Sequence, residues 1–317
     1  MKALAALPLL ALLLGQAVQA AAPEQQAVAS VHRTAPEAGH LILDQGGKDF
    51  AADIAVAATL AVVEPYGSGI GGGGFFLLRL SGEQGTDYRF LDARETAPQA
   101  AHRDLYLDDD NQLQRVINGP LAAGIPGLPA ALVHLAQHYG QLPLQQSLAP
   151  AVAAAEEGFA VGESYRTLVG FRLQAMQQDA ETARIFLRDN QAPAAGELIR
   201  QPELAATLRA IGERGLDGFY RGPVAARLIE GVRAAGGIWQ QAGLDSYRVI
   251  EREPVRFASR GFEVISAPLP SAGGIALAGM LQGLELLPPA KPGSTLRTHQ
   301  LVELMRRSYR DRALLLG

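Results

Sequence analysis

The sequence contains no cysteine among its 317 residues. This absence excludes a thiol nucleophile, a zinc site with cysteine ligands and any disulfide. An excess of charge of one sign is also missing, because 28 Lys and Arg residues against 32 Asp and Glu residues leave a net charge of −4. Nucleic-acid-binding domains normally carry a clustered basic excess, so we expect no nucleic-acid partner.

Long hydrophobic runs are absent beyond the N-terminus, where an export signal is present. Met1 and Lys2 form a short positive region, residues 3–14 form an apolar run, and Ala20 ends a small-residue cleavage site. This pattern predicts a secretory signal peptide over residues 1–20, with an uncleaved membrane anchor as the alternative. No later segment has the roughly 20 uncharged apolar residues that a bilayer span needs. We therefore expect a periplasmic or secreted protein without a membrane span after cleavage, and a cysteine-free chain is compatible with a bacterial periplasm.

Hydrophobic periodicity predicts an α+β fold with a helix-rich middle region. The alanine-rich residues 48–64 precede Pro65 and predict a buried helix. Residues 75–80 and 88–92 predict the two strands of a β-hairpin. Further helices are predicted around residues 128–135, 204–211, 223–235 and 301–309, and further strands at residues 247–250, 254–257 and 261–265. One domain over residues 21–317 is favoured over two.

A glycine-rich segment formally matches the dinucleotide-binding pattern G-x-G-x-x-G at residues 67–72. That mechanism requires a strand before the glycines and a helix after them, so that a pyrophosphate lies at the helix N-terminus. Here a helix is predicted before and a strand after, so we expect no nucleotide binding. Residues 71–74 instead indicate a place where backbone segments approach closely or φ is positive, next to a substrate.

Two pairs of polar residues resemble catalytic or metal sites in spacing only. His134 and His138 are four residues apart on a predicted helix, but Leu135 occupies the position of the catalytic Glu in H-E-x-x-H. We expect a solvated or helix-end pair there and no metal. The pair Thr298 and His299 opens a predicted amphipathic helix, where an N-terminal cap is expected in place of a nucleophile. The G-x-S-x-G motif of many serine hydrolases does not occur.

Arg94 is the candidate binding residue. It follows the second hairpin strand within residues 92–98, where Pro98 ends the segment. A guanidinium at such a strand-to-loop edge can bind a carboxylate through two parallel hydrogen bonds. The alternative is a structural ion pair of Arg94 with Asp92 or Glu95.

Three stretches together resemble the large-subunit portion of the γ-glutamyltranspeptidase (glutathione hydrolase) family. They are residues 49–80 with the glycine run, residues 90–101 with the Arg-Glu-x-Ala-Pro segment, and residues 267–285 with Pro-Ser-x-Gly-Gly. Residues 122–132 and the last helix are similar as well. The resemblance implies an N-terminal-nucleophile hydrolase, an αββα sandwich that is partial in this chain. It also implies that Arg94 binds the α-carboxylate of the γ-glutamyl substrate.

The resemblance further implies a precursor that cuts itself before a threonine, whose α-amine then acts as the base. Such an enzyme cleaves γ-glutamyl amides such as glutathione and transfers the glutamyl group to water or an amino acid, without a cofactor or metal. The nucleophilic threonine begins the small subunit in the family, and its motif is not found in residues 1–317. We therefore expect residues 21–317 to be an incomplete large-subunit domain that is inactive without this partner.

Two alternatives remain at this stage. A related acylase, acting on cephalosporin side chains or on poly-γ-glutamate, would share the architecture and differ in the acyl pocket. A truncated, non-catalytic remnant would bind a small acidic ligand or a partner subunit.

Overall fold

The computed structural model describes residues 26–82, 85–107, 110 and 118–316. The expected signal peptide, residues 1–20, lies outside the described residues. The longer helices that pack around the core are α1 (Thr34–Asp44), α2 (Asp49–Val63), α3 (Leu128–His138), α4 (Leu144–Glu157), α5 (Glu163–Gln177) and α7 (Pro202–Arg214). Shorter or peripheral helices are the 3₁₀ turn Pro120–Ala122, α6 (Ala180–Phe186), α8 (Asp217–Tyr220), α9 (Gly222–Ala234) and α10 (Gln241–Ser246).

The strands form three small antiparallel sheets in the described part of the chain. The largest has the order β1–β2–β5, made of β1 (Gly74–Gly82), β2 (Gly85–Ala93) and β5 (Ile250–Arg252). The other two pair β3 (Phe159–Ala160) with β4 (Leu198–Ile199), and β6 (Val255–Ser259) with β7 (Phe262–Ser266). The α+β class predicted from periodicity is confirmed.

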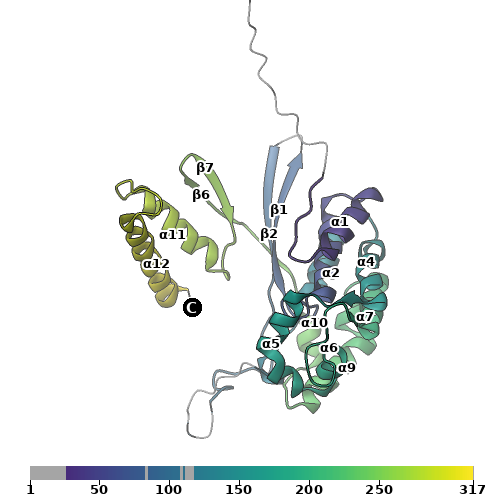
Figure 1. Cartoon of the computed structure of the whole chain (residues 1–317). Coiled ribbons are helices and arrows are strands. Elements are labelled where there is room, and N and C mark those ends of the chain that lie inside the picture. The colour runs from purple at the N-terminus through teal and green to yellow at the C-terminus, as the bar shows by residue number, and fades with distance from the viewer. Residues whose placement is uncertain (1–25, 83–84, 108–109, 111–117, 317) are drawn as a thin grey trace, which may run out of the picture.

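Helix α2 is buried within the helical layer, and its burial is what its sequence predicts. Its alanines leave room for close packing, and Ile54, Ala58 and Val62 are each at most 1% exposed. α1 and α4 both pack against α2 (Figure 1). The buried amide of Gln201 donates a 2.8 Å hydrogen bond to the backbone oxygen of Val62, which satisfies a carbonyl at the C-terminal end of the helix.

The β1–β2 hairpin carries the helical layer on one face. Its register pairs Gly74 with Ala93 and continues to the turn, and both strands extend further than residues 75–80 and 88–92. Leu78 and Leu91 belong to the main hydrophobic core. Because side chains alternate along a strand, Leu77 points to the opposite face, where it is 44% exposed.

The C-terminal part lies to one side of the rest of the molecule in Figure 1, and we call it the C-terminal module. It comprises β6, β7, α11 (Gly273–Glu285) and α12 (Thr295–Leu315), with α11 packed on both α12 and β6. Residues 253–254 alone connect β5 to β6. From Arg260 to the last described residue, only Gly274, Leu284 and Gln300 are buried.

Two local expectations are wrong. Residues 247–249 are not in a strand, since β5 begins at Ile250. The N-terminal cap of α12 is Ser294, four residues before Thr298, because the Ser294 hydroxyl accepts a 3.2 Å hydrogen bond from the backbone N–H of Arg297. None of the described helices combines the length and the apolar character needed to cross a membrane.

Candidate functional site at the end of β2

Arg94 is the first residue after β2, at the end of the hairpin opposite its turn. Its side chain is 59% exposed, and its Nε lies 3.3 Å from a carboxylate oxygen of Glu95. The guanidinium carbon lies 5.8 Å from the centre of the Phe75 ring. Among the described residues, no hydrogen-bonding partner contacts the two terminal nitrogens of Arg94. These are nitrogens with which an arginine can bind a carboxylate.

Gly73 brings the glycine run against the backbone of this site. A Cβ at Gly73 would lie only 2.2 Å from the carbonyl oxygen of Ala93 and 3.0 Å from the Cα of Arg94. None of the glycines from 71 to 74 has a positive φ. The sequence predicted either close approach of backbone segments or positive φ at these glycines. The close approach is confirmed, and positive φ is not found.

The glycine run also fixes the start of α3. The carbonyl oxygen of Gly72 accepts hydrogen bonds from the backbone N–H groups of Gly127 and Leu128, at 2.8 and 3.0 Å. α2 precedes the run and β1 follows it. The expected order of helix, glycines and strand is confirmed, so the run lacks the strand-to-helix context of a dinucleotide site.

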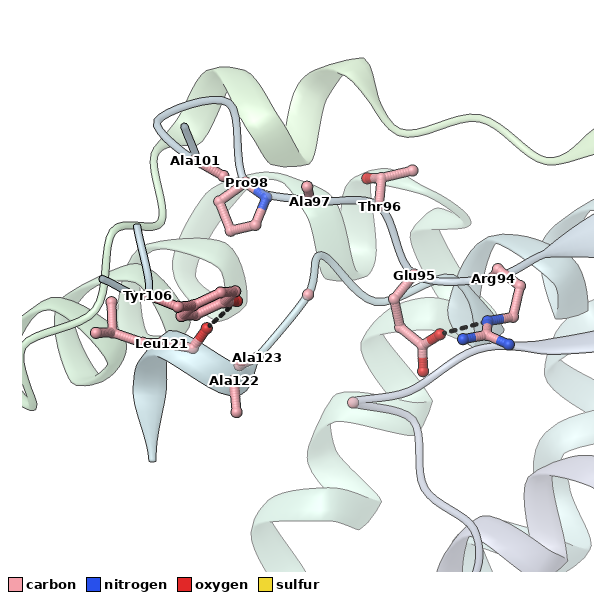
Figure 2. Close-up of a pocket in the computed structure, with 12 residues that line it drawn as sticks. Arg94, Glu95, Thr96, Ala97, Pro98, Ala101, Tyr106, Leu121, Ala122 and Ala123 are labelled. Carbon is pink, nitrogen blue, oxygen red and sulfur yellow. Dashed lines mark hydrogen bonds and ion pairs between the residues drawn. The ribbon is translucent and has the colours of Figure 1, made fainter. Parts of the chain in front are cut away.

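A cavity of about 460 Å³ opens beside Arg94 and Glu95 (Figure 2). Two reciprocal backbone hydrogen bonds between Thr96 and Ile125, of 3.2 and 2.8 Å, hold its two walls together. The hydroxyl of Tyr106 donates a 3.1 Å hydrogen bond to the carbonyl oxygen of Leu121 at its far end. Small residues line the rest: Gly71, Ala97, Pro98, Ala101, Ala122, Ala123 and Gly124.

A second cavity, of about 740 Å³, is also lined by Arg94. Its remaining lining belongs to the C-terminal module, including Ser271 of the Pro-Ser-x-Gly-Gly segment and Arg312 of α12. The Arg-Glu-x-Ala-Pro segment and the Pro-Ser-x-Gly-Gly segment therefore border one space. A carboxylate bound in this cavity would lie near two guanidinium groups, those of Arg94 and Arg312.

The Asp92 side chain does not pair with the guanidinium of Arg94. It is 6% exposed, accepts the backbone N–H of Arg94 at 3.1 Å, and binds the guanidinium of Arg252 at 2.8 and 2.9 Å. The hydroxyl of Tyr247 donates a 2.9 Å hydrogen bond to the carbonyl oxygen of Arg94. Burial raises the pKa of Tyr247, and the nearby carboxylates of Asp92 and Glu95 raise it further, so this tyrosine stays a donor. Sequence reasoning did not identify Arg252 or Tyr247.

The His134 and His138 pair is not part of this site. The two rings stack 4.1 Å apart, and the Nε2 of His134 lies 2.8 Å from the carboxylate of Glu251. The Tyr139 hydroxyl donates a 2.8 Å hydrogen bond to the same oxygen of Glu251. The described residues contain no group of three potential ligands that could hold a metal ion. His134 instead links α3 to β5, and His138 stacks on His134.

Known proteins resemble this chain over most of its length. The family described as gamma-glutamyltranspeptidase matches residues 35–317. The glutathione hydrolase proenzyme of Pseudomonas sp. (strain A14) is 37% identical over 299 residues, which cover 93% of this chain and 52% of that protein. The chain thus spans about half the length of the curated relatives that it matches.

Solved structures show the same relationship. The crystal structure of Helicobacter pylori gamma-glutamyltranspeptidase superposes with a TM-score of 0.87 at 32% identity, over 93% of this chain and 86% of that chain. The cephalosporin acylase of Bacillus halodurans superposes less closely, with a TM-score of 0.76 at 26% identity, over 92% of this chain and 57% of that chain.

Proposed function

Because the chain belongs to the γ-glutamyltranspeptidase family, we propose that it is the large-subunit part of a glutathione hydrolase. The complete enzyme would cleave γ-glutamyl amides such as glutathione and transfer the glutamyl group to water or to an amino acid. The observation that carries this proposal is the exposed guanidinium of Arg94, a residue that lines two cavities and whose terminal nitrogens have no protein partner among the described residues.

Arg94 would hold the α-carboxylate of the substrate through two parallel hydrogen bonds. The threonine of the small subunit would attack the γ-carbonyl carbon, while its own α-amine takes the hydroxyl proton and passes it to the leaving amine. Water or an acceptor amine would then attack the threonyl ester and release the glutamyl group. Binding of the substrate carboxylate at a fixed distance from the reacting carbonyl would bring the reacting atoms into line.

The exposed apolar side chains support the proposed partner, a small subunit with an N-terminal threonine. In the C-terminal module they comprise Phe262, Leu269, Ile275, Leu277, Leu286, Leu296, Leu301, Val302, Met305, Tyr309, Leu314 and Leu315. Leu77 and Ile250 add to them on the open face of the β1–β2–β5 sheet, at 44% and 47% exposure. Apolar surface of this extent is typical of an interface. A second sheet layer on that face would complete an αββα sandwich.

The role of Arg94 is tested in the complete, processed enzyme by Arg94→Lys. Lysine keeps the charge but cannot form the two parallel hydrogen bonds, so we expect KM for a γ-glutamyl amide to rise about tenfold to a hundredfold, by analogy with the cost of a lost charged hydrogen bond. A 4-aminobutyryl amide, which lacks the α-carboxylate, should be turned over as before. Arg79→Lys, in the same hairpin but near its turn, is the matched control. Unchanged KM in Arg94→Lys would refute the role of this residue.

The assignment as a self-processing precursor is tested by the intact mass of the natural product in its own cells. We expect two fragments, the first starting at Ala21 and the second at a threonine, in the periplasmic or secreted fraction. A single species ending at Gly317, with no separately encoded small subunit, would favour the non-catalytic remnant over the enzyme.

The acylase alternative draws on the likeness to the Bacillus halodurans enzyme. Glutaryl amides lack the α-amine of γ-glutamyl amides but are otherwise the same length. Preference for γ-glutamyl over glutaryl amides supports the glutathione hydrolase, and the reverse preference supports an acylase.

A further inference from the structure

We propose that Tyr247 and the Asp92–Arg252 ion pair are positioning residues that hold Arg94 at the angle needed to bind the substrate carboxylate. This inference rests on the proposed role of Arg94 and adds three residues to the site. In this proposal none of the three residues contacts the substrate. Asp92 and Tyr247 hydrogen-bond to the backbone N–H and the backbone carbonyl oxygen of Arg94, and Arg252 holds Asp92 in place.

Asp92 fixes the N–H side of Arg94. One carboxylate oxygen accepts the Arg94 N–H at 3.1 Å, and the other binds Arg252 through Nε at 2.9 Å and a terminal nitrogen at 2.8 Å. Both contacts from Arg252 end on the same oxygen, Oδ2, while Oδ1 accepts from the Arg94 N–H, so the carboxylate is held at both oxygens and has little freedom to rotate. Because Asp92 is only 6% exposed, water does not readily replace either contact.

Tyr247 fixes the carbonyl side of Arg94. Its hydroxyl donates to the Arg94 carbonyl oxygen at 2.9 Å, and its side chain is 6% exposed. The Tyr247 ring stacks on the ring of Tyr220, with centroids 5.6 Å apart and planes 5° from parallel. Gly127 allows this approach, since a Cβ there would lie 2.2 Å from the Tyr247 hydroxyl and 2.0 Å from the Ala93 carbonyl oxygen.

The backbone of Arg94 is therefore held from both sides while its side chain remains open. Its Nε contacts Glu95 at 3.3 Å, and the guanidinium carbon lies 5.8 Å from the centre of the Phe75 ring. Binding through two parallel hydrogen bonds depends on the direction of the guanidinium plane, and that direction starts from the Cα–Cβ bond. A change in the backbone at residue 94 would turn the guanidinium away from the carboxylate without removing its charge.

The test is Tyr247→Phe in the complete, processed enzyme, with Tyr220→Phe as the matched control. Tyr220 is also buried, and its hydroxyl bonds to Pro126 and Ala130 but not to Arg94. The readout is the ratio of kcat/KM for a γ-glutamyl amide to kcat/KM for the 4-aminobutyryl amide, which lacks the α-carboxylate. We expect Tyr247→Phe to lower this ratio by about threefold to tenfold, the effect of one neutral hydrogen bond, mainly through KM.

Tyr220→Phe should lower thermal stability and leave the ratio unchanged. An unchanged ratio in Tyr247→Phe, with Arg94→Lys still lowering it, would overturn the positioning role but leave the role of Arg94 intact. An unchanged ratio in Arg94→Lys itself would overturn the proposed function. If Tyr247→Phe does not fold, Arg252→Lys is subject to the same comparison, because lysine keeps the charge but gives up the second bond to Asp92.

A double variant separates positioning from general loss of stability. If Tyr247 acts through Arg94, then Tyr247→Phe added to Arg94→Lys should change the ratio by less than about twofold, because the bidentate contact is already lost. Additive losses in the double variant would contradict the proposal.

Discussion

Neighbouring glycines in the run from 71 to 74 face very different surroundings. A Cβ at Gly73 would overlap the carbonyl oxygen of Ala93, whereas a Cβ at Gly71 would meet nothing within 4 Å. We expect Gly73→Ala to destabilise the complete protein by about 3 kcal/mol or more, because the backbone at residue 73 must separate from the backbone of residues 93–95. Gly71→Ala should cost less than about 1 kcal/mol. Thermal or urea unfolding of both variants measures the difference, and equal costs would contradict the close approach.

Glu251 gives the molecule an acid-sensitive link between α3 and β5. Burial alone would raise its pKa, but hydrogen bonds to His134 and Tyr139 outweigh burial and lower the pKa from its ordinary 4.5. A carboxylate with a lowered pKa stabilises the fold above its ordinary pKa, and this stability is lost as pH falls through the lowered value. The link therefore weakens below about pH 4.5.

Glu251→Gln removes that pH dependence. We expect the variant to be less stable at pH 7 by about 1 kcal/mol and to lose less stability than the wild type between pH 5 and pH 3. Thermal unfolding of the complete protein across this range is the measurement. Glu253→Gln, at a carboxylate that is 76% exposed, is the control, and an equal acid response in Glu251→Gln and wild type would refute the link.

Sequence reasoning reached Arg94 because its signals are local. A strand, an arginine and a following Pro98 are adjacent in the chain, and they predict a guanidinium at an edge. The contacts of Arg94 with Tyr247 and of Asp92 with Arg252 join residues separated by about 150 positions. No local pattern encodes a contact at that separation, so these residues could be found only in three dimensions.

At the scale of elements, α2 depends on the small size of its alanines. Ala58 is fully buried in the main core, and α1 and α4 pack against this helix. We expect Ala58→Leu to destabilise the complete protein by about 1–3 kcal/mol through overpacking. Ala226→Leu, at an exposed position of α9, should change stability by less than about 0.5 kcal/mol. Unfolding by urea compares the two, and similar values would mean that the packing around α2 is loose.

The elements that periodicity predicted are those whose own residues are nearly all apolar or regularly spaced, such as α2 and the β1–β2 hairpin. α4 was not predicted, since Pro150 lies inside it and interrupts the pattern. The strand expected at residues 247–250 begins only at Ile250, where pairing with β2 starts. Tyr247 is held outside the strand by its hydrogen bond to Arg94. Tertiary contacts decided only the second case.

At the scale of the whole molecule, the C-terminal module has almost no interior of its own. Leu286 and Leu315 are 88% and 78% exposed, and Phe262 is 74% exposed. We expect residues 21–317 produced alone to bind a hydrophobic dye and to associate at micromolar concentration. Coproduction with the proposed small subunit should lower dye binding severalfold. A monodisperse chain that melts cooperatively without dye binding would contradict the proposed interface.

The connection between β5 and β6 has a consequence for ligand binding. Residues 253–254 allow no more than about 10 Å between the Cα atoms of Arg252 and Val255, and the ring of Pro254 fixes one of the intervening backbone angles. Such a short tether holds the C-terminal module at a high effective concentration next to the sheet that carries Arg94. The two walls of the 740 Å³ cavity are therefore already held together before a ligand binds. A ligand that contacts both walls does not have to offset the translational entropy that bringing two separate parts together would cost.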